Sequence, residues 1–159
     1  MTEIKPAYDF PAEVRMLFEE YTQMLVQGEP SFGAYLDLQH YGEEVDHLKE
    51  KYGPPAGRLY LAFCEGEPAG CIGLRQLNAE NCEMKRLYVR PRFRGKGIGS
   101  MLVQRIIGDA KEIGYKNIFL DTLPFLQSAL KLYKRCGFCE TERYNDSPVD
   151  SSIFMKLEL

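Results

Sequence analysis

The sequence lacks the long apolar runs of membrane and secreted proteins. No run approaches the ~20 apolar residues that a membrane-spanning helix needs, and Met1–Pro6 has no apolar segment of the secretory kind. A basic excess is also missing, since 20 Lys and Arg stand against 23 Asp and Glu and give a net charge of -3. That balance argues against attraction to nucleic acid or to an anionic membrane. We therefore expect a cytoplasmic protein without nucleic-acid or membrane partners.

The five cysteines lack the even, closely spaced pattern of a disulfide framework. Free thiols in a reducing compartment are the simplest account. Cys136 and Cys139 have C-x-x-C spacing, but no second pair lies nearby to complete a zinc site. We interpret them as two small buried apolar residues, a redox pair being the alternative. His40 and His47 lie near acidic residues, where solvated helix positions are a simpler interpretation than a metal site, so we expect no metal.

No repeat, low-complexity tract or composition break divides the 159 residues, so we expect a single domain, residues 1–159. Apolar residues at helical spacing predict helices over residues 9–26, with Asp9 as cap, over 43–51, over 98–113, and from Pro124 to Gly137. Apolar runs with strand periodicity predict strands over residues 58–64, 69–77, 82–89, 116–122, 138–144 and 153–157. This order indicates an α+β fold with a mixed sheet.

A basic stretch interrupts this otherwise acidic chain. It holds six cationic and no acidic residues, namely Lys85, Arg86, Arg90, Arg92, Arg94 and Lys96. Gly95, Gly97 and Gly99 overlap its end, at the start of the helix predicted over 98–113. Glycines allow a close approach of backbone to ligand, and the free N–H groups of a helix's first turn favour an anion. The pattern predicts a pyrophosphate or polyphosphate site, and the alternative is a solvated basic turn that caps the helix.

Two common phosphate-binding motifs fit this loop poorly. A P-loop has a lysine and Ser or Thr after its last glycine, but Gly99 is followed by Ser100 and Met101. A dinucleotide fold would use Asp121, which lies 22 residues beyond Gly99. However, the glycines are spaced G-x-G-x-G, and residues 90–94 separate them from the preceding strand. The dinucleotide interpretation is therefore the weaker one.

Two motifs resemble those of the GNAT superfamily of N-acetyltransferases. Glu83–Val89, followed by Arg94-Gly-Lys-Gly-Ile-Gly99, is similar to the family's central motif, [QR]-x-x-G-x-[GA]. Ala129–Phe138 is similar to the next motif, a helix ending in Tyr-x-x-x-Gly-Phe. The order of elements from Ala69 to Leu157 also follows the family. The resemblance implies an acetyl-CoA-dependent N-acetyltransferase that acts on a primary amine of an unidentified small molecule, peptide or protein.

The resemblance also implies where the coenzyme binds. The expected fold is a mixed, mostly antiparallel sheet of about six to seven strands flanked by helices, with a central splay between two parallel strands. Pantetheine would lie in that splay along the backbone of Leu87, Tyr88 and Val89, and one N–H of the same strand would polarise the thioester carbonyl. Leu126 departs from the family, in which many members have an asparagine that contacts the cofactor. The pyrophosphate would bind the backbone N–H groups of Arg94, Gly95, Lys96, Gly97, Ile98, Gly99 and Ser100.

Glu83 is the predicted general base. Attack on a thioester needs a neutral amine, and an alkyl ammonium has a pKa near ~10.4, so a base or a water chain has to take a proton. Similar family members carry a catalytic glutamate at this position. Strand alternation predicts that Glu83 shares one face with Lys85, Leu87 and Val89. The alternative is a structural carboxylate paired with Lys85 or Arg86.

Tyr133 is the predicted general acid, because the resemblance places it at the coenzyme sulfur. The departing thiolate resembles that of cysteine, with a pKa near ~8.5, and a nearby phenol can protonate it. The alternative is an ordinary core tyrosine on an apolar stripe with Leu126, Ala129 and Leu130. In the family the loop that here holds Tyr144 and Asn145 often borders the acceptor site. Glu29, Tyr35 and Asp37 are further candidates for contact with the acceptor.

Other functions remain open at this point. A coenzyme A-binding sensor without turnover is the main alternative, although the presence of both Glu83 and Tyr133 favours the enzyme. Nucleic-acid binding by the basic stretch is disfavoured because exposed aromatic residues are not interleaved with it. Similar proteins often pair through terminal strands, so a homodimer is one expectation.

Overall fold

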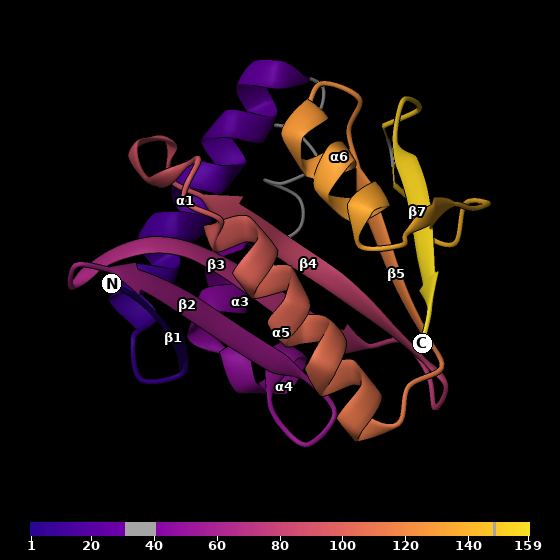
Figure 1. The fold of residues 1–159 in the computed structure, drawn as a ribbon, viewed down its shortest axis with the longest axis horizontal. Coiled ribbons are helices and arrows are strands. Elements are labelled where there is room, and N and C mark those ends of the chain that lie inside the picture. The colour runs from indigo at the N-terminus through magenta and orange to yellow at the C-terminus, as the bar shows by residue number, and fades with distance from the viewer. Residues whose placement is uncertain (31–40, 148) are drawn as a thin grey trace.

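The computed structural model describes residues 1–30, 41–147 and 149–159 (Figure 1). Within them one sheet of seven strands has the order β1-β2-β3-β4-β5-β7-β6. The strands are β1 (Thr2–Pro6), β2 (Arg58–Cys64), β3 (Glu67–Gln76), β4 (Asn81–Val89), β5 (Asn117–Thr122), β6 (Cys139–Glu140) and β7 (Ile153–Glu158). Neighbouring strands are antiparallel except β4 and β5, which run parallel. The predicted mixed, mostly antiparallel sheet is confirmed.

Helices cover both faces of the sheet (Figure 1). α1 (Pro11–Gly28), α3 (Tyr41–Asp46) and α4 (Leu48–Tyr52) contribute to one apolar cluster with β2. On the other face, α5 (Ile98–Ile113) and α6 (Gln127–Arg135) contribute to a second, and a 3₁₀ turn, η1 (Pro91–Phe93), precedes α5. None of the described helices is long and apolar enough to cross a membrane.

α5 follows from its sequence almost residue by residue. Its buried side chains include Ile98, Leu102, Ile106 and Ala110, at the helical spacing that the apolar pattern predicts. Burial stabilises the fold by roughly 1.5–3 kcal/mol for each large aliphatic side chain. Gly114, with a φ of 106°, ends the helix in the left-handed conformation that glycine adopts readily. This packing fixes α5 against the sheet, with its N-terminus beside the end of β4.

Four predicted boundaries are wrong. α1 begins at Pro11 with Phe10 as N-cap and no side-chain capping bond, so Asp9 does not cap it. The helix predicted over 43–51 is two helices, because the chain breaks at His47. The helix predicted from Pro124 begins at Gln127.

The fourth error concerns the strand predicted over 138–144, of which the sheet contains only Cys139–Glu140. The chain then leaves the sheet edge, and Tyr144 turns back toward β4. β1 was not predicted at all. Its alternating exposure gives a weak apolar signal, and its pairing with β2 depends on residues almost 60 positions away.

Candidate active site

β4 and β5 pair only at their first residues. The parallel register joins Asn81, Cys82 and Glu83 to residues 117–119, whereas β5 stays paired with β7 as far as Thr122. Beyond Glu83 the two strands therefore separate, and within the described chain this edge of β4 has no strand beside it. The predicted splay between two parallel strands is confirmed.

A β-bulge at Arg86 accompanies the separation. Arg86 has a φ of 62°, and the pairing of β3 with β4 shifts register between Cys71 and Gly73. A left-handed residue other than glycine costs of order 1–3 kcal/mol unless its surroundings hold it. Here Nε and Nη2 of Arg86 donate to the two carboxylate oxygens of Glu44 at 3.1 and 3.0 Å, and the guanidinium lies 5.9 Å from the ring centroid of Phe18. These contacts hold the bulge in place.

The bulge also changes which side chains share a face of β4. Met84, Leu87 and Val89 all pack into the cluster under α5, so the alternation slips by one residue between the first two. The prediction that Leu87 and Val89 share a face with Glu83 and Lys85 is therefore wrong. Strand alternation holds only where no extra residue is inserted, and Arg86 is that residue.

The glycine loop forms a left-handed turn at the N-terminus of α5. Gly95 and Gly97 have φ values of 79° and 77°, and Gly97 is the N-cap. Within the described chain, the backbone N–H groups from Gly95 to Ser100 donate no hydrogen bond, the first donor of the helix being Met101 to the Gly97 carbonyl. Consecutive free N–H groups at the positive end of a helix dipole can bind an anion.

The basic stretch does not gather as a whole around this loop. Three of its cations pair with carboxylates of other elements, as Arg86–Glu44, Arg90–Glu20 and Arg92–Glu67. Among the described residues, Arg94 and Lys96 have no carboxylate within 4.0 Å. Arg94 instead donates from Nε to the backbone oxygen of Val89 at 3.0 Å. Two of the six cations, rather than all of them, therefore adjoin the glycines.

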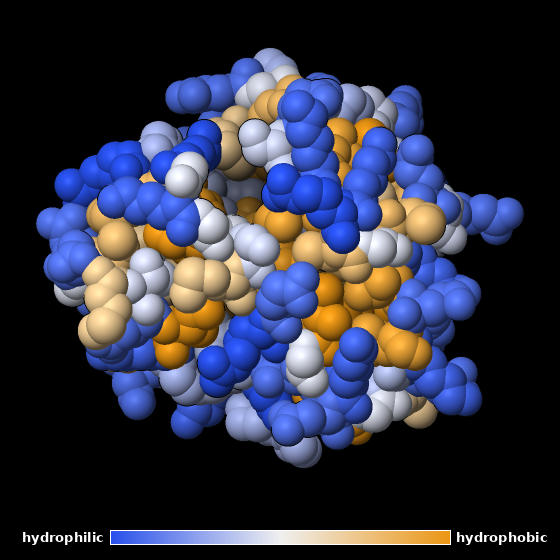
Figure 2. All heavy atoms as spheres, viewed as in Figure 1, coloured by the Kyte–Doolittle hydropathy of each residue, from blue (hydrophilic) through white to orange (hydrophobic). Residues whose placement is uncertain are grey.

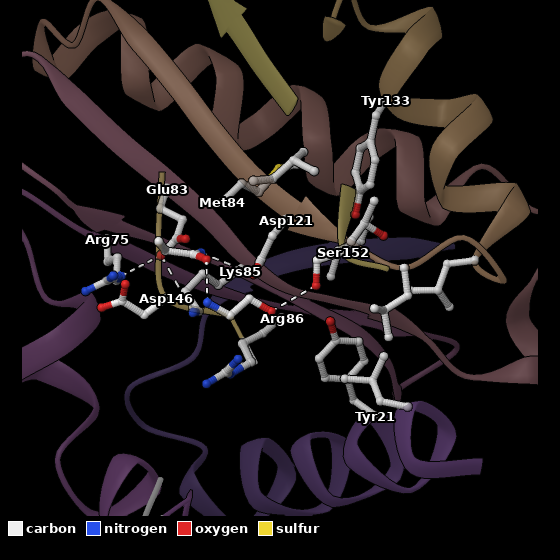
Figure 3. A pocket seen from close by; sticks show the side chains of 18 of the residues that line it. Tyr21, Arg75, Glu83, Met84, Lys85, Arg86, Asp121, Tyr133, Asp146 and Ser152 are labelled. Atoms are coloured by element: carbon white, nitrogen blue, oxygen red, sulfur yellow. Dashed lines mark hydrogen bonds and ion pairs between the residues drawn. The ribbon is translucent and has the colours of Figure 1, made fainter. Parts of the chain in front are cut away.

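A cavity of ≈ 280 Å³ occupies the splay between β4 and β5. In the space-filling view, the surface is hollowed between α1 and α6 (Figure 2). Apolar side chains, among them Leu87, Leu123 and Leu126, line one part of the cavity. Charged side chains line another part, in which Arg75, Glu83 and Lys85 lie close together (Figure 3).

Tyr133 stands at the apolar side of the cavity, with its hydroxyl directed inward (Figure 3). The side chain is buried, and its ring packs edge-on against Phe138 at 5.9 Å between centroids. Within the described chain the hydroxyl makes no hydrogen bond. Burial raises the pKa of Tyr133, and the nearby Asp121 carboxylate raises it further. The phenol therefore stays protonated at neutral pH and can donate a proton.

Glu83 is fully buried and surrounded by donors. Its Oε1 accepts a hydrogen bond from Arg75 Nε at 2.7 Å and lies 3.6 Å from Lys85 Nζ, and its Oε2 accepts one from the Tyr144 hydroxyl at 2.5 Å. Burial alone would raise the pKa of Glu83, but Lys85, Tyr144 and Arg75 together hold it below its ordinary value. The carboxylate therefore stays ionised. The sequence also allowed a structural carboxylate paired with Lys85 or Arg86. Lys85 does pair with Glu83, whereas Arg86 pairs with Glu44.

The loop after β6 brings one predicted candidate, Asn145, to the cavity and holds the other, Tyr144, against Glu83. The Tyr144 ring packs on Phe119 at 5.0 Å and on Phe154 at 5.5 Å between centroids. Asn145 donates from Nδ2 to Asp121 Oδ2 at 3.2 Å and lines the cavity itself. The loop therefore joins the charged part of the cavity to the end of β5.

Sequence reasoning did not place Arg75, Lys51 or Asp121 at this site. No sequence pattern marked Arg75 as a site residue, because it reaches the cavity only through the pairing of β3 with β4, which sets Arg75 opposite Glu83. Lys51 comes from α4, across the sheet. Asp121 was weighed only as a dinucleotide ligand. Tyr88 of the predicted coenzyme edge directs its side chain away, under α1, where its hydroxyl donates to Glu20.

The remaining candidates lie elsewhere. Glu29 follows α1 as its C-cap, and His47 is exposed beside Glu50. His40, Tyr35 and Asp37 lie outside the described residues. No group of three metal-binding side chains occurs among the residues that the structure describes.

Both cysteines of the C-x-x-C pair are free. Cys139 is exposed and Cys136 is half-buried, so their interpretation as two buried residues is wrong. Cys139 lies on β6 at the open edge of the sheet, where one face of a short strand meets solvent.

Known proteins resemble this chain in sequence and in fold. The family model described as Acetyltransferase (GNAT) family matches residues 15–138. An uncharacterized N-acetyltransferase of Schizosaccharomyces pombe is 39% identical over 149 residues, covering 92% of this chain and 87% of that protein. A GNAT-family acetyltransferase structure from Staphylococcus aureus has a TM-score of 0.79 at 22% identity, covering 99% of each chain. One from Elizabethkingia anophelis with acetyl-CoA bound has a TM-score of 0.56 at 29% identity, covering 65% of this chain and 77% of that chain.

Proposed function

The chain belongs to the GNAT family of N-acetyltransferases, and on that premise we propose that it transfers the acetyl group of acetyl-CoA to a primary amine by direct attack. One observation carries the proposal. The open edge of β4 as far as Leu87 and the inward hydroxyl of Tyr133 line a single cavity, and the free N–H groups at the start of α5 follow the end of the same strand. We also propose that residues 1–159 act as one domain, and that the reaction is cytoplasmic.

The coenzyme would bind along two backbone surfaces. Its pyrophosphate would accept hydrogen bonds from the N–H groups of residues 94–100, with the Arg94 and Lys96 side chains adding charge. Its pantetheine would pair with the unpaired edge of β4 at Leu87, Tyr88 and Val89. The Arg94 guanidinium, which bonds the Val89 carbonyl, would then turn toward the phosphates. The acetyl group would reach the cavity beside Tyr133.

The chemistry consists of one substitution at the thioester carbon. The amine nitrogen attacks this carbon, a backbone N–H of β4 stabilises the oxyanion, and the bond from carbon to sulfur breaks. The sulfur leaves as a thiolate and takes the proton of the Tyr133 hydroxyl, and the tyrosinate takes up a proton from solvent once coenzyme A has left. Burial raises the pKa of this phenol and so keeps it protonated until the thiolate forms.

The amine must also lose a proton, and we assign its removal to Glu83 acting through Tyr144. Glu83 lines the cavity, but its carboxylate has almost no exposed surface from which to meet the acceptor directly. The Tyr144 hydroxyl already donates to it at 2.5 Å, so this hydroxyl can accept the amine's proton as it passes its own to Glu83. The proton then resides on the carboxylate until it returns to solvent.

Release of the free thiol from acetyl-CoA tests the proposal. The protein should release coenzyme A from acetyl-CoA when a suitable amine is added, with the acetylated amine identified by mass spectrometry. A thiol-reactive dye gives the rate, and a sample without the amine gives the background hydrolysis. Tight coenzyme binding with no release across a broad panel of amines would instead favour a coenzyme-binding sensor.

A further inference from the structure

We infer that the acceptor is an amine that also carries a carboxylate, an amino-acid-like molecule, and that Lys85 with Arg75 binds this carboxylate. This inference rests on the proposed acetyl transfer and names its acceptor class. It starts from the charged part of the cavity, where the proposed mechanism gives Arg75 and Lys85 no role.

Four cationic side chains line the cavity, namely Lys51, Arg75, Lys85 and Arg86. Two of them already share a carboxylate, because Glu44 accepts hydrogen bonds from both Arg86 and Lys51. The other two flank Glu83, so a single carboxylate faces two cations. Asp121 and Asp146 also line the cavity, but among the described residues only the Glu83 carboxylate lies within 4.0 Å of the Arg75 and Lys85 nitrogens.

Lys85 has room for another anion. Its side chain is 19% exposed, and its Nζ lies 3.6 Å from the nearest carboxylate oxygen, beyond hydrogen-bonding distance. Burial and the neighbouring Arg86 lower its pKa, while Glu83 and Asp121 oppose that change. An ammonium carries three donors, and a substrate carboxylate would supply the short charge-assisted bonds that Glu83 does not give.

Arg75 has donors to spare as well. Its Nε donates to Glu83, which leaves the two terminal nitrogens of the guanidinium for a ligand, and its side chain is 35% exposed. Arg75 and Lys85 lie on neighbouring strands, and Figure 3 places both beside Glu83 on the same side of the cavity. The two cations together can hold one carboxylate.

Asp121 supplies the opposite polarity nearer the acetyl group. It lies at the end of β5, where it lines the cavity and accepts a hydrogen bond from Asn145. The acceptor's ammonium would then lie beside the Asp121 carboxylate, and its carboxylate would lie beside the Lys85 ammonium, so each group meets a charge of opposite sign. A polyamine has no group for the cationic wall and would be repelled by it.

Matched acceptors test the inference. We would measure kcat/KM for L-alanine and L-alaninamide, for β-alanine and β-alaninamide, and for spermidine, each corrected for its fraction of free amine. We expect a carboxylate acceptor to be preferred over its amide by roughly 10- to 100-fold, the contribution of one charge-assisted bond. Preference for an amide or for spermidine would overturn the inference but leave acetyl transfer standing. Absence of both coenzyme binding and thiol release would instead contradict the proposed function.

Variants locate the carboxylate site. Lys85→Gln and Arg75→Gln should each remove most of the preference for the carboxylate acceptor. If the two substitutions act only by disturbing Glu83, the rates with the carboxylate acceptor and with its amide should fall equally. An unchanged ratio of these rates would also overturn the inference. Lys116→Gln, at an exposed lysine paired with Glu80, is the matched control and should keep the ratio. Coenzyme affinity, measured by calorimetry, should be the same in all three variants. An unchanged affinity shows that each variant is folded.

Discussion

The hydroxyl of Tyr144 donates a 2.5 Å hydrogen bond to Glu83, a residue 61 positions earlier in the chain. The bond joins the loop after β6 to the last residue of β4 that pairs with β5. Glu83 is fully buried, and in the proposed mechanism the tyrosine oxygen relays the acceptor's proton to it. The carboxylate is held ionised by Lys85, Tyr144 and Arg75 against the effect of burial on its pKa.

Tyr144→Phe should therefore lower kcat by ten-fold or more, because the relay loses its hydroxyl. Removing a donor to the charged form also raises the pKa of Glu83. The acid limb of the pH profile should accordingly move upward by about one pH unit. Steady-state rates from pH 4 to 8 measure both effects.

Tyr115→Phe is the control for this change. It also removes a tyrosine hydrogen bond, from the hydroxyl to the Ala56 carbonyl at 2.6 Å, but far from the splay. Its pH profile should match that of the unmodified protein. An unchanged kcat in Tyr144→Phe would remove Tyr144 from the proton path.

Tyr133→Phe should lower kcat by ten-fold or more and leave coenzyme affinity nearly unchanged. The Tyr133 hydroxyl makes no hydrogen bond within the described chain, so the melting temperature should also stay the same. Acetyl thioesters of more acidic thiols need less protonation of sulfur. Their rates should therefore fall less, and an equal loss with every leaving group would contradict the role of general acid.

Gly97→Ala should weaken coenzyme binding and destabilise the fold. The φ of 77° at this position costs a residue with a side chain roughly 1–2 kcal/mol, or a drop of about 2–8 °C in melting temperature. Gly108→Ala, inside the same helix and with no atom within 4 Å of its added Cβ, should instead raise stability by roughly 0.5–1 kcal/mol. Thermal melts with and without coenzyme A measure both. Unaltered coenzyme affinity in Gly97→Ala would argue against the pyrophosphate site.

Local signals were enough to predict much of the fold. α5 matches its predicted bounds because the apolar period and Gly114 are both encoded within it. β2 is also placed at its predicted residues, 58–64. The order of elements came from the helical and strand periods, whereas the splay was implied by the family resemblance of the two motifs around Gly97 and Tyr133.

The charged part of the cavity was not predictable in this way. Arg75 meets Glu83 only because β3 and β4 pair there, and Lys51 arrives from a helix on the far side of the sheet. The bulge at Arg86 is equally non-local, since its left-handed backbone is held by Glu44, 42 residues earlier. The apolar pattern of β4 therefore cannot predict the inserted residue, because the contacts that stabilise it come from another element.

The pair of Glu44 and Arg86 should make stability depend on acidic pH. Burial by itself would raise the pKa of Glu44, but Arg86 and Lys51 lower it from 4.5 to about 2. A carboxylate with a lowered pKa in the folded state contributes its stability above the unfolded pKa. That contribution is lost as the pH falls from about 4.5 toward about 2.

Glu44→Gln should accordingly destabilise the protein at pH 7 by roughly 3–5 kcal/mol, because the nearly buried Arg86 and the half-buried Lys51 lose their shared carboxylate. The difference from the unmodified protein should shrink as the pH falls below 4, where both lack the charge. Urea melts at pH 7, 5 and 3 give the free energies of unfolding. Asp46→Asn, which breaks an exposed ion pair with Arg15, is the control and should cost no more than about 1 kcal/mol at any pH. A Glu44→Gln penalty that stays constant down to pH 3 would show that packing, and not the charge on Glu44, holds the bulge of β4.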